Sequence, residues 1–205
     1  DAQSLQGIDV VFICSPTHLH LKHAIIAARA GAHIFLEKPL SHTMRGVRAL
    51  VALVGHKKLI TMVGCNMRFH PCLQFMQQYV FGGKLGKIYS IDFEFGYYLP
   101  NWRPNTDYRK NYAVKRSTGG GIILDDIHEF DLLFWFTDFT RVKKHALFSN
   151  HASDLAIETE DQSVGMFLFS SGVLGTVRSN YLAQDYRRRV TIVGERGTLT
   201  WDFKE

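Results

Sequence analysis

The strongest constraint on the fold is an alternation of short apolar runs and helix-type segments in the first third of the chain. Residues 8–14, 33–36 and 59–65 are largely apolar and stop at polar or proline-containing segments. Between them, residues 19–30 and about 43–54 have helix-type composition and end at Gly31 and Gly55. The order strand, helix, strand, helix, strand predicts parallel strands that are buried on both faces and joined by right-handed crossovers.

The pattern changes after residue 66, which predicts a second domain. Residues 69–81 are typical of a helix, 88–97 alternate as in a strand, and a glycine triplet at 119–121 precedes a helix that extends to about Phe136. Residues 162–169 with 173–180, and 190–193 with 198–201, form two strand pairs around turn residues, which predicts two hairpins. We therefore expect an α/β plus α+β protein: a partial parallel sheet over 1–65, then an α+β domain over 66–205 with a large, mainly antiparallel sheet.

Composition and charge exclude several classes of protein. Apolar residues make up 46% and charged residues 21%, which is ordinary for a globular protein. No apolar stretch is long enough for a membrane helix and no leader-type start is present, so we expect a cytoplasmic protein without a membrane partner. The net charge of +5 comes from dispersed basic residues, so we expect no nucleic-acid partner; an anionic small molecule fits the same charge.

The three cysteines, Cys14, Cys65 and Cys72, indicate neither a disulfide framework nor a metal centre. A small odd number argues against a disulfide framework, and their spacing has no paired metal-ligand pattern. We therefore expect reduced thiols and no metal site.

Polar residues follow each of the three predicted parallel strands. Because ligands bind beyond the carboxyl ends of such strands, these residues should converge on one edge and form a site. Lys38 lies there between Glu37 and Pro39, where partial loss of hydration would let its ammonium group donate a proton to, or polarise, a substrate oxygen. The alternative is a surface lysine paired with Glu37.

Asp125 and His128 form a second candidate pair. They are three residues apart in the predicted helix, which places them on one face, and a histidine is the natural base for an alcohol proton. Asp125 could orient the imidazole or contact a hydroxyl, and Asp131 could fix the ring from its other side. The alternative is a helix-start carboxylate beside a hydrogen-bonded, buried histidine. The preceding glycine triplet would allow a backbone to approach a ligand.

Three segments together, residues 15–20, 31–40 and 119–131, resemble the Gfo/Idh/MocA oxidoreductase family, named for glucose-fructose oxidoreductase and inositol dehydrogenase. The resemblance implies that 1–65 is the C-terminal half of a Rossmann-like dinucleotide-binding domain and that 66–205 serves substrate binding and oligomerisation. It further implies NAD or NADP as cofactor, and reversible oxidation of a hydroxyl group on a sugar, nucleotide sugar or cyclitol. A cis peptide bond between Lys38 and Pro39 is also expected from it.

The same resemblance implies roles for individual residues. It assigns catalysis to Lys38, Asp125 and His128, and cofactor binding to Ser15, Pro16, His20, Glu37, Lys38 and Asn66. A narrower similarity over residues 101–112, to a branch linked to surface-polysaccharide sugars, accompanies an expected role in substrate binding for Trp102, Tyr108 and Arg109. Arg68, after the third predicted strand, is also expected to bind substrate. The aspartate and histidine are four apart in many family members and three apart here. We expect Glu37, Lys38 and Asn66 to share one cleft with Asp125 and His128.

The chain departs from the family at the pyrophosphate-binding turn. No Gly-x-Gly-x-x-Gly occurs in the 205 residues. We therefore expect an N-terminally truncated fragment of an NAD(P)-dependent dehydrogenase, inactive and poor in cofactor affinity by itself. The alternative is a non-catalytic sugar-binding or assembly module that has lost cofactor binding.

The hairpins also predict association. Phe167, Phe169, Val173 and Val177 alternate with polar residues, and a sheet that helices cover on one face leaves the other for a partner. We expect a homo-oligomer formed through the C-terminal sheet.

Overall fold

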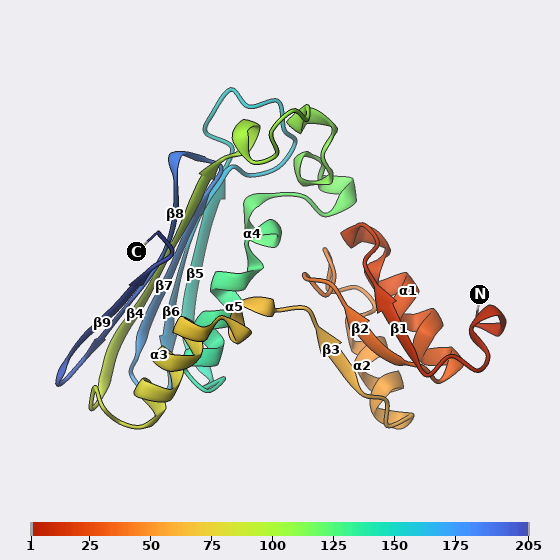
Figure 1. Cartoon of the computed structure of the whole chain (residues 1–205), viewed down its shortest axis with the longest axis horizontal. Coiled ribbons are helices and arrows are strands. Elements are labelled where there is room, and N and C mark those ends of the chain that lie inside the picture. Colours follow the sequence, from red (N-terminus) through yellow and green to blue (C-terminus); the bar gives the residue numbers. More distant parts are fainter. Residues whose placement is uncertain (1, 205) are drawn as a thin grey trace.

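The computed structural model describes residues 2–204, which contain two sheets with helices between and beside them (Figure 1). The first sheet is parallel, in the order β1-β2-β3, with β1 at Val10–Ile13, β2 at His33–Leu36 and β3 at Thr61–Val63. Helices α1 (Thr17–Ala30) and α2 (Val47–His56) form its crossovers. The predicted order of the first five elements is confirmed.

Only one face of this sheet is covered within residues 2–204. Ile13, Ile34 and Leu36 pack against α1 and α2. The other face carries Phe12, which is 69% exposed, and Met62, which is 43% exposed. The prediction of strands buried on both faces is therefore wrong for the described residues. Two successive right-handed crossovers that run in the same direction place both helices on the same side.

Helix α2 begins later than the sequence pattern predicts. The Ser41 hydroxyl accepts a hydrogen bond from the main-chain N–H of Thr43, and the Thr43 hydroxyl accepts one from that of Arg45. Such local bonds favour turns over helix. Gly46 then adopts a left-handed conformation with φ of 87° directly before the helix.

The second sheet has six strands in the order β5-β6-β7-β4-β8-β9. Their bounds are β4 Ile88–Tyr98, β5 Val142–Asn150, β6 Gln162–Phe169, β7 Leu174–Asn180, β8 Leu182–Gly194 and β9 Gly197–Asp202. Only the β4–β7 pair is parallel, so the expectation of a mainly antiparallel sheet with two hairpins is confirmed. Strand β5 was not predicted, because its basic start hides the alternation.

Helices α3 (Pro71–Phe81) and α5 (Ile127–Phe136) lie on one face of this large sheet (Figure 1). Their apolar side chains form the main core with the strands, including Leu73, Met76, Phe93, Leu133, Phe136, Val177 and Ile192. Short 3-10 helices fill most of residues 99–118 between β4 and the glycine triplet. A helix able to span a bilayer is absent from residues 2–204.

The residues predicted to mediate association lie on the covered face. Phe169, Val173 and Val177 are buried in the main core, and Phe167 packs edge-on against Phe130 of α5. Their expected place on the open face is wrong, because alternation along a strand shows which residues share a face but not which face the helices cover. Association through the sheet stays a prediction. The open face instead presents three exposed apolar side chains, Phe148, Met166 and Leu174.

Candidate active site

The predicted helix over 122–136 is interrupted at the candidate catalytic residues. Helix α4 (Ile122–Asp125) ends where Asp126 adopts φ of −101° and ψ of 34°, and α5 starts at Ile127. Asp125 and His128 therefore do not lie on one face of one helix, and that prediction is wrong. The Asp126 carboxylate is bound on the sheet, where Ser179 Oγ donates to it at 2.5 Å.

The glycine triplet serves close packing within the protein. A Cβ on Gly119 would lie 2.8 Å from His42 Cβ and 3.0 Å from Thr17 Cβ, and the residue has φ of 82°. The space expected for a ligand at Gly119 is thus occupied by the end of the first sheet and the start of α1. This contact brings the carboxyl edge of the first sheet against α4.

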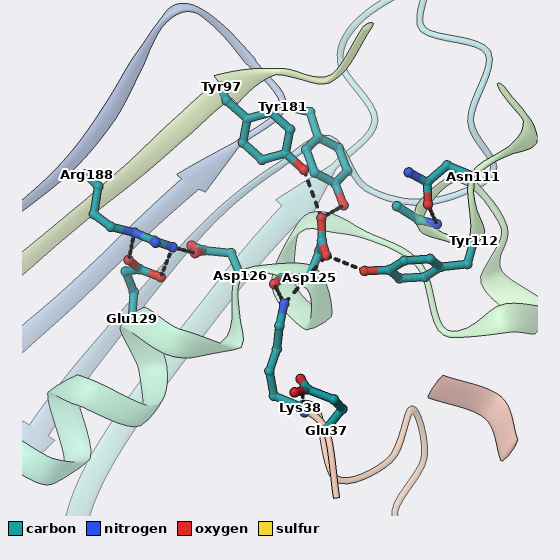
Figure 2. Close-up of polar contacts among 11 residues, drawn as sticks. Glu37, Lys38, Tyr97, Asn111, Tyr112, Asp125, Asp126, Glu129, Tyr181 and Arg188 are labelled. Atoms are coloured by element: carbon teal, nitrogen blue, oxygen red, sulfur yellow. Dashed lines mark hydrogen bonds and ion pairs between the residues drawn. The ribbon is translucent and has the colours of Figure 1, made fainter. Parts of the chain in front are cut away.

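The Asp125 carboxylate accepts hydrogen bonds from three tyrosine hydroxyls that come from different segments (Figure 2). The distances are 2.8 Å from Tyr97 in β4, 2.9 Å from Tyr112 in a 3-10 helix, and 3.3 Å from Tyr181 between β7 and β8. Burial and the Asp125 charge raise the pKa of all three phenols above its ordinary value. They therefore remain protonated donors, which hold the carboxylate in one orientation.

Lys38 reaches Asp125 from the other domain. Its Nζ donates to the Asp125 main-chain oxygen at 2.5 Å and lies 3.7 Å from Oδ1 (Figure 2). Glu37 instead accepts a 3.3 Å hydrogen bond from the Lys38 main-chain N–H. The ammonium group is thus directed at Asp125 rather than at Glu37, and the expected cis peptide between Lys38 and Pro39 is confirmed.

His128 is buried, and its Nδ1 has no hydrogen-bond partner in the described part of the chain. Burial, followed by the charges of Lys38 and Arg188, lowers the pKa of His128 to about 3, against the opposing effect of Asp125. The ring is therefore neutral at pH 7. A neutral imidazole has a nitrogen lone pair that can accept a hydroxyl proton, but the lowered pKa makes this ring a weaker base than an ordinary histidine.

The residues that follow Asp125 and His128 in the chain, Asp126 and Glu129, contact a different part of the protein. Asp126 and Glu129 point to β8, where Arg188 lies between them (Figure 2). This ion cluster was not predicted from the sequence. Arg188 is one of three consecutive arginines, and such a run is typical of a solvent-exposed surface. The position of Arg188 opposite inward-facing Phe95 in the β4–β8 register was the available signal.

At the edge of the first sheet, His20 holds the two strand-end turns together. It is buried, with Nδ1 at 2.8 Å from the Pro39 carbonyl oxygen and Nε2 at 2.7 Å from that of Ser15. Neither ring nitrogen is left for a cofactor. Pro16 directly precedes α1, and Asn66 is exposed after β3. The structure therefore brings Lys38 to Asp125, whereas the expected position of Asn66 in the same cleft stays a prediction.

Arg68 forms an ion pair with Asp131, the residue that was expected to fix the His128 ring. Its Nε and Nη2 donate to the Asp131 carboxylate at 2.7 and 2.5 Å. The predicted role of Asp131 against the His128 ring is therefore wrong, because in the described residues the Asp131 carboxylate pairs with Arg68 and makes no hydrogen bond to that ring. A cavity of about 600 Å³ opens beside this pair and Lys38, walled by apolar residues of β3 and α5.

The other predicted substrate residues differ in their distance from the site. The Trp102 ring packs 4.3 Å from that of Tyr97, so it adjoins the tyrosine cluster, and it is 44% exposed. The Tyr108 hydroxyl accepts a 3.1 Å hydrogen bond from the Ala156 main chain. Arg109 is exposed and pairs with Asp107 within its own turn.

Comparison with known proteins relates both parts of the chain to one family. Residues 1–65 match the oxidoreductase family model with an NAD-binding Rossmann fold, and residues 73–200 match the GFO/IDH/MocA C-terminal domain. Levoglucosan dehydrogenase of Pseudarthrobacter phenanthrenivorans is 28% identical over 96% of this chain and 56% of its own length. Myo-inositol 2-dehydrogenase of Thermotoga maritima is 27% identical over 96% of this chain and 57% of its own length.

The fold agrees with these similarities. A solved structure of levoglucosan dehydrogenase in complex with NADH and levoglucosan superposes with a TM-score of 0.84 at 25% identity, covering 96% of this chain and 55% of that one. The chain thus spans about half the length of the curated relatives that it matches. Both family models and the juxtaposition of Lys38 with Asp125 lead to the same assignment: the chain belongs to the Gfo/Idh/MocA family of oxidoreductases.

Proposed function

We propose that this chain carries the catalytic part of an NAD(P)-dependent oxidoreductase that acts on a hydroxyl or keto group of a sugar, nucleotide sugar or cyclitol. One observation carries the proposal: the ammonium group of Lys38 meets Asp125 across the domain boundary, near an uncharged His128. The relatives support the substrate class, since they include a levoglucosan dehydrogenase, inositol dehydrogenases and a UDP-N-acetylglucosamine 3-dehydrogenase.

The residues divide the proton chemistry between them. His128 takes the hydroxyl proton at its free Nδ1, and Lys38 stabilises the negative charge that develops on the same oxygen. Asp125, fixed by its three tyrosines, holds the Lys38 ammonium in place. A bound nicotinamide supplies the hydride acceptor, and loss of the hydroxyl proton makes departure of the hydride easier.

The side chains at the carboxyl edge of the first sheet fit the nicotinamide half of such a cofactor. Ser15 offers a hydroxyl, Glu37 a carboxylate, Lys38 an ammonium group and Asn66 an amide, which together match ribose hydroxyls and a carboxamide. The His128 Nδ1 has no hydrogen-bond partner in the described residues, which leaves it available to a polar group of a bound molecule.

A substrate panel tests the proposal. The protein that carries this chain together with a complete dinucleotide-binding domain is incubated with NAD or NADP and with myo-inositol, levoglucosan or UDP-N-acetylglucosamine, while formation of reduced nicotinamide is followed by absorbance. We expect reduction with at least one member of this class. Saturable binding of these compounds, measured by calorimetry without any reduction, would instead support a non-catalytic sugar-binding module.

We also propose that the open face of the large sheet pairs with a second copy of the chain. Phe148, Met166 and Leu174 expose apolar surface there, and in the described residues the helices pack on the opposite face (Figure 1). Met166→Glu should convert an oligomer to a monomer in sedimentation at micromolar concentration, because it places a charge within the contact. Phe75→Glu, at an exposed position on α3, is the matched control. A monomeric wild-type protein would contradict the pairing.

A further inference from the structure

The carboxylates around the break between α4 and α5 have partners in different parts of the protein. Asp125 points to Lys38 and the tyrosines, whereas Asp126 points to β7 and β8 (Figure 2). His128 is followed by Glu129, which also points to β8. Asp126 and Glu129 are each 1% exposed. Each of the two proposed site residues, Asp125 and His128, is thus followed in the chain by a residue whose side chain is bound on the sheet.

Arg188 is the side chain that anchors both neighbours. Its Nε lies 2.7 Å from Glu129 Oε1, and its Nη2 lies 3.3 Å from Asp126 Oδ1. The flat guanidinium group lies 4.3 Å from the centre of the Phe95 ring, and Nη1 is 3.7 Å from Met67 Sδ. A planar fork can contact two carboxylates in fixed directions, which the single ammonium group of a lysine cannot do.

The cluster depends on the arginine for its charge balance. It holds two carboxylates and one guanidinium group in a buried place, where Arg188 has a side-chain exposure of only 13%. Burial, with the nearby Glu129 charge, raises the pKa of Asp126 well above its ordinary range, which favours one shared proton and a neutral cluster. Without Arg188, both carboxyl groups would be buried with no cation beside them.

We infer that Arg188 is a positioning residue of the active site: by holding Asp126 and Glu129 on the sheet, it sets the break between α4 and α5 that fixes where Asp125 and His128 stand relative to Lys38. This inference deepens the proposed function and rests on it. Arg188 touches neither Lys38 nor the reacting atoms and acts through the chain segment 125–129. The charges that reach His128 come from three segments: Lys38 after β2, Asp125 in α4 and Arg188 in β8.

The test observes the His128 ring directly, by NMR of the protein labelled with ¹⁵N in its histidine rings. His128→Gln assigns the signals. In Arg188→Met, the titration midpoint of His128 should rise by about one pH unit or more, because a nearby positive charge is lost and carboxylates remain. In Arg188→Lys, which retains the charge, the midpoint should rise less, but the ring shifts at pH 7 should still change, because one ammonium group cannot hold both carboxylates.

Arg189→Met is the matched control, since Arg189 lies on the same strand, faces the opposite side of the sheet and pairs with Asp202 at 2.7 Å. It should leave the His128 signals unchanged. If Arg188→Met does not fold, Arg188→Lys decides the question. A folded Arg188 variant with a lower melting temperature but wild-type His128 shifts and midpoint would reduce Arg188 to a structural role and overturn the inference. The proposed function fails separately, if His128→Gln retains full turnover.

Discussion

Replacing His128 by glutamine, in the protein that carries this chain together with a complete dinucleotide-binding domain, is expected to lower turnover by roughly 10²- to 10⁴-fold, the usual effect of losing a positioned base, with little change in cofactor affinity. Glutamine retains hydrogen-bonding groups but cannot take a proton from a hydroxyl. Lys38→Met should have an effect of the same order, because it removes the charge that stabilises the developing alkoxide. The kcat and KM for the best substrate of the panel, together with a fluorescence titration of NADH, measure both effects.

His70→Gln is a suitable control for the loss of a histidine. The His70 Nδ1 is also buried without a partner in the described residues, but His70 lies directly before α3, and its ring packs at a tilt 5.1 Å from the ring of Trp201 in β9. Turnover should stay within about twofold of wild type in this variant, because it lies outside the proton path. If His70→Gln and His128→Gln lost turnover equally, His128 would have no specific catalytic role.

The second large effect is expected for stability, at the glycine triplet. A Cβ on Gly120 would overlap the main-chain carbonyl of Ala113, and that oxygen accepts a 3.0 Å hydrogen bond from the Gly121 N–H. The clash involves backbone on both sides, so no side-chain rotation relieves it. Gly120→Ala should therefore lower the free energy of unfolding by more than about 3 kcal/mol, or prevent accumulation of folded protein.

Gly55→Ala is the matched control for this substitution. Gly55 lies in helix α2 with nothing within 4 Å of an added Cβ, so alanine should stabilise the protein slightly, by up to about 1 kcal/mol. Urea denaturation followed by circular dichroism measures both variants. Equal unfolding midpoints for Gly120→Ala and wild type would show that the 113–121 packing is not as tight as described.

The sequence predicted those parts of the fold that depend on local pattern. Apolar runs, glycine stops and turn residues located β1 to β4 and both hairpins. The helix break at Asp126 was not predictable in this way, because the Asp126 side chain pairs with Arg188, 62 residues later in the chain, and sequence pattern does not reveal such a distant contact. Strand β5 was missed because it starts with basic residues, and the covered face of the sheet was misassigned because periodicity does not say where α5 packs.

The candidate site was predicted only in part, for a similar reason. Motif resemblance identified Lys38, Asp125 and His128, and the structure brings Lys38 to Asp125. The tyrosines around Asp125 were missed: Tyr97 looks like an ordinary inward strand residue, and Tyr181 lies in the link between two strands. Their convergence on one carboxylate results from the tertiary structure, and their spacing in the sequence does not indicate it.

Direct transfer of deuterium tests the central claim, that Lys38, Asp125 and His128 form a site for oxidation of a sugar or cyclitol hydroxyl group. The best substrate of the panel is labelled with deuterium at the carbon that is oxidised, and the reduced nicotinamide is analysed by mass spectrometry after a single turnover. The account predicts that the label appears in the nicotinamide, and that His128→Gln slows its appearance without changing its destination. A cofactor that binds and remains unlabelled with every member of the panel, or equal transfer rates in His128→Gln and wild type, would contradict it.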